Sequence, residues 1–210
     1  TEPFGSDFFK LSYPPHPKVP FIANCLKLKS DNEFGRYVVT DTALLPGEII
    51  AIEEPFSKCL LRDQNYKYCC NCLSDNCLNL IPCKHCTGAM FCSEKCQSDG
   101  WKKFHRFDCA IIDKLDKICT KIIRIAVHTF FEALDIYNFN VLDLMNALNE
   151  IADDPSTVFD HDIKGGKIKR ARVLATIDSL VTNEESRNSA DRFQRSGIVA
   201  IVTHLFLKHT

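Results

Sequence analysis

Cysteine is the residue type in this 210-residue chain that most clearly indicates chemistry. There are twelve cysteines, and nine of them fall between Cys69 and Cys109. Thiolates and imidazole are ligands that zinc prefers, and a short spacing lets two of them reach one ion. Seven of these cysteines and one histidine form closely spaced pairs: Cys69 with Cys72, Cys83 with Cys86, Cys92 with Cys96, and His105 with Cys109.

Eight ligands are the number that two closed tetrahedral zinc sites require. One site would hold four thiolates, and the other would hold three thiolates and an imidazole. His105 and Cys109 are four residues apart, so a helix would place them on one face. Ser93 and Asp99 are candidate N-caps for the two helices that carry ligands. The spacing leaves open whether sequential or interleaved pairs share an ion.

Scattered core cysteines or a disulfide set are the competing explanations. A disulfide framework is typical of short secreted proteins, whereas the first residues show no basic start followed by an apolar run. We therefore expect metal binding, a reducing compartment, and a cytoplasmic and nuclear location. The segment also has few aliphatic residues to bury. Zinc, which contributes about 10–16 kcal/mol in small fingers, would then drive its folding rather than catalysis, because no ligand position is left for water.

Five cysteines remain outside the pairs. Cys70 could replace its neighbour Cys69 as a metal ligand. Only Cys69, however, is separated from Cys72 by two residues, as the pair spacing requires. We expect most of the others to be small buried hydrophobic side chains rather than ligands. The five are Cys25, Cys59, Cys70, Cys77 and Cys119.

Composition places the chain among ordinary globular proteins. It has 26 Lys and Arg against 27 Asp and Glu, and 45% of its residues are hydrophobic. No run approaches the ~18 apolar residues that a membrane span needs, so we expect no membrane partner. The balanced charge argues against nucleic-acid binding, and we interpret the basic segment 164–172 as a solvated loop leading into a helix.

Three kinds of segment must position the ligands. The first 20 residues are expected to form an extended leader, because they include Pro14, Pro15, Pro17 and Pro20. Short β-type runs at 23–28, 36–40, 48–52 and 56–61 follow. Gly35 would adopt positive φ if the turn at 30–35 is a plain β-turn rather than a ligand-binding loop. After residue 110 the period becomes helical, with helices expected over 140–152, 168–182 and 187–208. The first predicted helix carries one apolar stripe, formed by Ile111, Leu115, Ile118, Ile122 and Ile125.

The ligand order resembles the MYND-type zinc finger, as do Tyr68, Phe91 and the Trp101-x3-His105 ending. The resemblance implies that the two sites interleave. One zinc would bind Cys69, Cys72, Cys92 and Cys96, and the other would bind Cys83, Cys86, His105 and Cys109. Some relatives bind Pro-rich peptides on the MYND surface, which suggests Trp101 or Phe91 as residues that line a groove.

Upstream, residues 33–38, 45–50 and 53–56 resemble the first half of the SET domain in the SMYD protein-lysine methyltransferases. In that family a MYND finger interrupts the SET fold, and a helical insert follows. The resemblance implies an α+β protein with a leader at 1–20, a split SET-type β unit at 21–65, a two-zinc MYND finger at 66–109 and a helical insert at 110–210.

The resemblance also implies S-adenosylmethionine as cofactor and a histone or non-histone protein or peptide lysine as substrate. It places the methyl donor near Gly35 and Arg36, with Asn183 reaching back to it. Phe34 and Tyr37 depart from the family pattern, which has a basic residue and a second glycine there. The Asn-His-Ser-Cys segment, the active-site tyrosines and the post-SET cysteines of the family are not found in these 210 residues.

We therefore assign no catalytic residue and expect an N-terminal part of a methyltransferase, inactive by itself because the second half of SET is absent. A non-catalytic MYND adaptor that binds Pro-rich peptides in transcriptional regulation is the alternative. A nucleic-acid-binding zinc protein is a third possibility, which the balanced charge disfavours.

The purified protein is expected to contain two zinc ions per chain, because the eight ligands fill two tetrahedral sites. Elemental analysis against protein concentration measures this ratio. A ratio of one or zero would contradict the eight-ligand assignment.

Overall fold

The computed structural model describes residues 10–31, 33–75, 78–118, 120–152 and 183–209, with residues 170, 171, 173, 174, 177, 178 and 180 between the last two ranges. The described part mixes short strands with helices, which is compatible with the predicted α+β class. The chain divides into two compact units. Unit 1 comprises Thr1–Phe56 and Met145–Ser179, and unit 2 comprises Ser57–Leu144 and Leu180–Thr210. The split SET-type arrangement and the boundaries at 20, 65 and 109 stay predictions.

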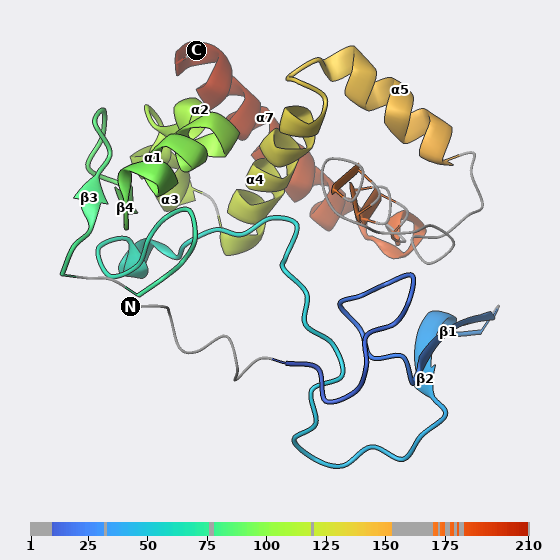
Figure 1. The fold of residues 1–210 in the computed structure, drawn as a ribbon. Helices are drawn as coiled ribbons and strands as arrows, with labels where there is room; N and C mark the ends of the chain where they lie inside the picture. Colours follow the sequence, from blue (N-terminus) through green and yellow to red (C-terminus); the bar gives the residue numbers. More distant parts are fainter. Residues whose placement is uncertain are drawn as a thin grey trace. The chain divides into compact units, whose positions relative to one another are not determined.

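Unit 1 contains a β-hairpin, drawn in blue in Figure 1. Strand β1 (Leu26–Asp31) pairs antiparallel with β2 (Gly35–Thr40), and Asp31 lies opposite Gly35. The Asp31 side chain accepts the backbone N–H groups of Glu33 (3.0 Å) and Phe34 (2.7 Å), which tightens the turn. Gly35 has φ +68°, which is what a plain β-turn would require, and a Cβ there would meet nothing within 4 Å. Backbone conformation, not lack of space, therefore requires glycine.

A small core supports this hairpin. Ala23, Cys25 and Leu26 are buried, and Tyr13, Ile22, Leu44 and Ile50 pack against them. The predicted strand at 48–52 is reduced to one isolated bridge between Ile22 and Ala51. Backbone bonds from Ala23 N–H to the Ile50 carbonyl and from Ile52 N–H to the Phe21 carbonyl, both 2.8 Å, flank that bridge. The strand prediction is wrong in extent, because the pairing with residues 21–23 covers only residues 50–52.

Unit 2 begins with the cysteine-rich segment. Strands β3 (Ile81–Pro82) and β4 (Met90–Phe91) pair antiparallel, and a helical run follows as α1 (Glu94–Gly100), the π-helical η2 (Trp101–His105) and α2 (Arg106–Asp108). Ser93 Oγ accepts the Cys96 N–H at 3.1 Å, so the predicted N-cap is confirmed. The predicted cap at Asp99 is wrong. The backbone is still helical at Gly100, so no helix starts at that point.

Helices make up most of the remaining described chain (Figure 1). These are α3 (Ile112–Ile118), α4 (Lys121–Ile136), α5 (Val141–Ala152), the short 3-10 helix η4 (Glu184–Ser186) and α7 (Ser189–His209). Helices α5 and α7 confirm the predictions at 140–152 and 187–208. The predicted helix at 168–182 lies mostly outside the described residues. No helix in the described ranges is both long and apolar enough to cross a membrane.

The single apolar stripe predicted after residue 110 is wrong, because the chain breaks between α3 and α4. Thr120 has extended backbone (φ −68°, ψ 163°) and precedes α4. Leu115 on α3 is buried, but Ile122 on α4 is 69% exposed. Helix α4 instead buries a face that includes Arg124, His128 and Phe131. Because of this break, α4 buries a different face from the one that the apolar stripe predicts.

The predicted strand at 56–61 is also absent, and α4 supplies the reason. The Lys58 carbonyl lies 3.1 Å from His128 Nδ1, and the Leu60 carbonyl accepts from an Arg124 guanidinium nitrogen at 3.3 Å. Buried side chains of a helix thus satisfy backbone groups that a neighbouring strand would otherwise have paired.

Gly35→Ala is expected to lower the free energy of unfolding of the hairpin by about 1 kcal/mol, because an alanine at positive φ brings its Cβ against the backbone. Gly35→Asn is the matched control and should lose less, because asparagine tolerates this conformation. Native-state amide exchange at the backbone N–H groups that pair β1 with β2 measures both. Equal losses would show that the φ angle is not the constraint.

Candidate metal centre

The first ligand cluster joins the start of the cysteine-rich segment to β4 and α1. Four Sγ atoms lie within 4.8 Å of one another, and those of Cys72 and Cys92 are 3.6 Å apart. A tight turn presents the first pair. The Cys69 N–H donates to the Ser74 carbonyl at 3.0 Å, and the N–H of Leu73, which has φ +63°, donates back to the Cys69 carbonyl at 2.9 Å. The cluster consists of Cys69, Cys72, Cys92 and Cys96.

The second cluster joins the β3 region to the end of the helical run. Its ligand atoms also lie within 4.8 Å of one another, with Cys83 Sγ 3.8 Å from Cys109 Sγ. Cys86 Sγ lies 3.4 Å from His105 Nε2. The Cys109 N–H donates to the His105 carbonyl at 2.8 Å, which places these two residues one helical turn apart. The cluster consists of Cys83, Cys86, His105 and Cys109.

The two clusters alternate along the chain. The first takes the first and third pairs of the sequence, and the second takes the second and fourth pairs. The sequence left sequential and interleaved pairing open, and the structure places the residues in the interleaved order that the MYND resemblance implies. Each cluster therefore ties together segments that a sequential arrangement would leave separate.

The residues of both clusters fit zinc. A tetrahedron with Zn–S bonds of about 2.3 Å has edges of about 3.8 Å, close to the two Sγ–Sγ distances. All ten cysteines among the described residues are free thiols, so disulfides do not account for the close approach. Soft sulfur and imidazole ligands in sets of four are typical of structural zinc. Bound zinc would supply a crosslink between the segments, and each set of four leaves no coordination position for a substrate.

Local hydrogen bonds prepare two of the thiols to bind a metal. Burial opposes ionisation of Cys72, but hydrogen bonds with Ser74 and with neighbouring thiols outweigh it and lower the Cys72 pKa to about 7. For Cys86, burial again opposes ionisation, and the contact with His105 outweighs it and lowers the pKa to about 7. The thiolate is the form that binds zinc, so each cluster contains one thiol that ionises near neutral pH.

His105 is held by a buried carboxylate. Its side chain is 0% exposed, and Nδ1 lies 2.7 Å from Asp108 Oδ1. Burial favours the neutral ring, but hydrogen bonds with Asp108 and Cys86 outweigh it and raise the His105 pKa to about 10 without metal. Burial also opposes ionisation of Asp108, yet its hydrogen bonds with His105 and His128 lower the Asp108 pKa. Zinc binding at Nε2 would displace the proton that His105 shares with Cys86.

Aromatic residues of the finger pack its core. Phe91 is 0% exposed and its ring centroid lies 5.9 Å from that of His105. A groove-lining role for Phe91 is therefore wrong, because no surface of it is open to a peptide. Trp101 is half-buried, with its ring centroid 4.9 Å from that of His85. The close approach of α1 to β4 depends on Gly100, where a Cβ would lie 2.9 Å from the Phe91 ring.

The candidate methyl-donor residues are not part of either cluster. Gly35 and Arg36 begin β2 in unit 1, whereas Asn183 is in unit 2, where it precedes η4 with φ +50°. Their part in a methyl-donor site stays a prediction.

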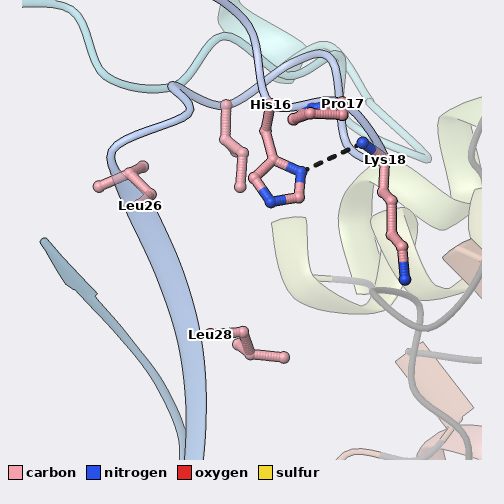
Figure 2. Close-up of a pocket in the computed structure, with 6 residues that line it drawn as sticks. His16, Pro17, Lys18, Leu26 and Leu28 are labelled. Carbon is pink, nitrogen blue, oxygen red and sulfur yellow. Dashed lines mark hydrogen bonds between the residues drawn. The ribbon is translucent and has the colours of Figure 1, made fainter.

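Unit 1 also contains a hollow beside β1. Its volume is about 410 Å³, and it is lined by His16, Pro17, Lys18, Ile22, Leu26 and Leu28. Figure 2 shows the His16 ring turned toward the Lys18 backbone, where Nδ1 accepts the N–H groups of Lys18 (3.3 Å) and Val19 (3.2 Å). One His16 nitrogen thus stabilises a turn, and the other lining residues are mostly aliphatic. The lining gives no arrangement for acid–base or nucleophilic catalysis.

His128 is a buried, hydrogen-bonded core histidine that contacts Asp108 and the Lys58 carbonyl. The sequence analysis did not identify Asp108. An acidic residue three positions after a histidine ligand, on the same helical run, was the available signal. Cys70 is buried beside Cys69 but belongs to neither cluster.

Comparison with known proteins finds relatives that are named as lysine methyltransferases or as SET and MYND domain-containing proteins. The mouse protein-lysine N-methyltransferase SMYD4 is 25% identical over 122 residues, covering 48% of this chain and 15% of the relative. The Arabidopsis thaliana histone-lysine N-methyltransferase ASHR1 is 27% identical over 129 residues, covering 60% of this chain and 26% of the relative. A SET and MYND domain-containing protein of Dictyostelium discoideum is 39% identical over 57 residues, 27% of this chain and 4% of the relative.

This chain is related to the SET and MYND proteins. No protein-family model matches it. The human ankyrin repeat and MYND domain-containing protein 1 is also similar, at 33% identity over 57 residues, 25% of this chain and 6% of the relative. The chain spans about a quarter or less of the length of each of these relatives. The comparisons and the two Cys/His clusters together support zinc binding and a relationship to SET and MYND proteins.

Cys69→Ala is expected to reduce bound zinc from two ions to one per chain, because it leaves the first cluster with three ligands. Cys70→Ala is the matched control, since Cys70 is the next residue and is also buried. It should retain both ions and lose only packing. Mass spectrometry of the native holoprotein counts the ions. Loss of zinc from Cys70→Ala alone would show that the ligand assignment is off by one residue.

Proposed function

We propose that this chain is the zinc-binding N-terminal part of an S-adenosylmethionine-dependent protein-lysine methyltransferase of the SET and MYND type. A MYND finger at 66–109 interrupts a split SET-type β unit at 21–65, and a helical insert occupies 110–210. The interleaved arrangement of the two ligand clusters carries this proposal, because it is the arrangement that the MYND resemblance implies. Relatives named as methyltransferases, which align with up to 60% of the chain, support the enzyme assignment.

Zinc has a structural role in this proposal. The finger has little apolar material of its own, and the two clusters fix strands β3 and β4 against the helical run. Two ions are proposed per chain, with every ligand position filled by protein. The reaction would take place elsewhere, and no residue of this chain is assigned a catalytic role.

The methyl donor is proposed to approach the turn between β1 and β2. Gly35 is suited to this, because nothing lies within 4 Å of the position a Cβ would occupy and the backbone is open there. Arg36 follows at the start of β2, and Asn183 would complete the contact from the helical insert. The substrate would be a lysine of a histone or non-histone protein, in the cytoplasm or nucleus.

A non-catalytic adaptor is the second candidate. Phe34, which is 70% exposed at the same turn, and Tyr37 stand where the family has a basic residue and a second glycine. Their rings pack edge to face with centroids 6.3 Å apart, so two aromatic side chains occupy part of the turn surface. The similarity to a human MYND protein whose name includes ankyrin repeats and no methyltransferase activity also favours an adaptor. Such an adaptor would bind Pro-rich peptides beside Trp101.

Calorimetric titration of S-adenosylmethionine tests the enzyme assignment. The zinc-loaded chain is compared with a longer form of the protein that carries residues after Thr210, and we expect binding only by the longer form. Gly35→Asn in that form keeps the turn conformation but fills the open space, so it should weaken binding about tenfold, or about 1.4 kcal/mol. Unchanged affinity would remove Gly35 from the site.

A Pro-rich peptide titrated in parallel separates the two candidates. Peptide binding without any binding of S-adenosylmethionine by either form would contradict the methyltransferase assignment and favour the adaptor.

A further inference from the structure

A buried chain of contacts leads from the second ligand cluster to helix α4. His105 Nδ1 lies 2.7 Å from one Asp108 oxygen, and the other Asp108 oxygen lies 3.3 Å from His128 Nε2. The opposite ring nitrogen of His128, Nδ1, lies 3.1 Å from the Lys58 carbonyl. His105, Asp108 and His128 are each 2% exposed or less. The pair formed by Asp108 and His128 is called the Asp108–His128 bridge below.

The hydrogen positions in this chain follow from the acceptors. A histidine that binds zinc through Nε2 carries its hydrogen on Nδ1, which then donates to Asp108. A carbonyl oxygen can only accept, so His128 Nδ1 donates to Lys58. Both carboxylate oxygens of Asp108 thus face ring nitrogens. Because every bond lies out of water, a ligand held in this way has little freedom to rotate.

Packing holds the His128 end of the Asp108–His128 bridge in place. The Phe104 ring stacks on His128 with centroids 4.3 Å apart and an interplanar angle of 25°. Phe104 belongs to η2, the same helical turn that carries His105, and is itself buried. Helix α4 therefore contacts the ligand-bearing helical run through the hydrogen-bonded contact at Asp108 and the stacked contact at Phe104. A second stacked contact joins Phe107 of α2 to Phe131 of α4, with centroids 4.3 Å apart. Through the Lys58 carbonyl, His128 also contacts the segment that directly precedes the 66–109 finger.

We propose that Asp108 and His128 are positioning residues of the second zinc site, and that this site depends on helix α4, outside the 66–109 finger. The proposal rests on the zinc binding proposed above. Asp108 holds the His105 ring so that Nε2 points toward Cys86, and His128 holds Asp108 in place. A carboxylate that accepts the other ring N–H of a histidine ligand also raises the basicity of that ligand.

The first cluster provides an internal reference, because its four thiolates come from residues that the bridge does not contact. Weakening the bridge should therefore lower the zinc affinity of one site only. It follows that a peptide restricted to 66–109 would keep tight zinc at the first site and hold the second ion weakly.

The experiment measures the zinc affinity of each site by chelator competition on the folded 210-residue protein. Cobalt spectra assign the sites, since an all-thiolate site and a site with one imidazole absorb differently. Asp108→Ala removes both contacts and is expected to weaken the second site about 10–100-fold. Asp108→Asn retains one oxygen acceptor, enough for the contact with His105 but not for both histidines, so it should weaken the site less than Asp108→Ala. His128→Phe keeps the stacking on Phe104 but loses the hydrogen bonds.

His204→Phe is the matched control, because it makes the same substitution at an exposed position of α7 and should change neither site. Unchanged affinity of the second site in Asp108→Ala or His128→Phe would overturn the proposal. Equal loss at both sites would also overturn it, since this indicates general unfolding rather than positioning. A wild-type protein that binds fewer than two zinc ions would instead contradict the proposed function.

Discussion

Tetrahedral coordination by four protein ligands is the constraint on which the cysteine-rich part of the structure depends. Phe91, Phe104 and Ile111 are buried there, but the strands have only two residues each, far short of what a hydrogen-bonded sheet needs to persist in water. The ligand clusters compensate by fixing both strands to the helical run. Because the clusters alternate along the chain, neither can form without bringing distant segments together.

Unit 1 also has too few strands for a stable sheet, and it contains neither ligand cluster. A two-stranded hairpin is marginal by itself, and β1 and β2 have no third partner strand among the described residues. The small core around Ala23 and the backbone bonds to the segment around Ile50 provide the support that is present. The turn between the strands combines an Asp31 side-chain bond with the positive φ of Gly35, so its shape is determined locally. A turn of fixed shape with open space beside it is a suitable place for a ligand to approach.

The features that the sequence predicted correctly are local ones. The Ser93 cap depends on residues a few positions apart, and so do the periods of α5 and α7. The interleaving of the clusters could not be derived from spacing, because sequential pairing satisfies the same rules. It was implied only by the MYND resemblance.

The wrong predictions concern segments whose structure depends on residues that are distant in the sequence. The stripe from Ile111 to Ile125 has an unbroken helical period, yet the chain breaks at Thr120 and α4 turns a face with Arg124 and His128 inward. Arg124 and His128 on that face also contact the backbone carbonyls of residues 60 and 58. These contacts replace the strand pairing that local β-propensity predicted. A periodicity records which residues are apolar, but buried polar side chains with specific partners can determine the orientation of a helix.

The adjacency of Cys69 and Cys70 has a consequence for the choice of metal ligand. Two neighbouring thiols offer the ion a choice, and a slip by one residue would place the wrong sulfur in the coordination sphere. The backbone removes this ambiguity, because the Cys70 N–H donates to the Met90 carbonyl at 2.7 Å and so faces Cys70 into the core. That bond exists only once β4 lies alongside. In the folded protein, the bond between Cys70 and β4 therefore distinguishes the two thiols, because it holds Cys70 away from the cluster that contains Cys69.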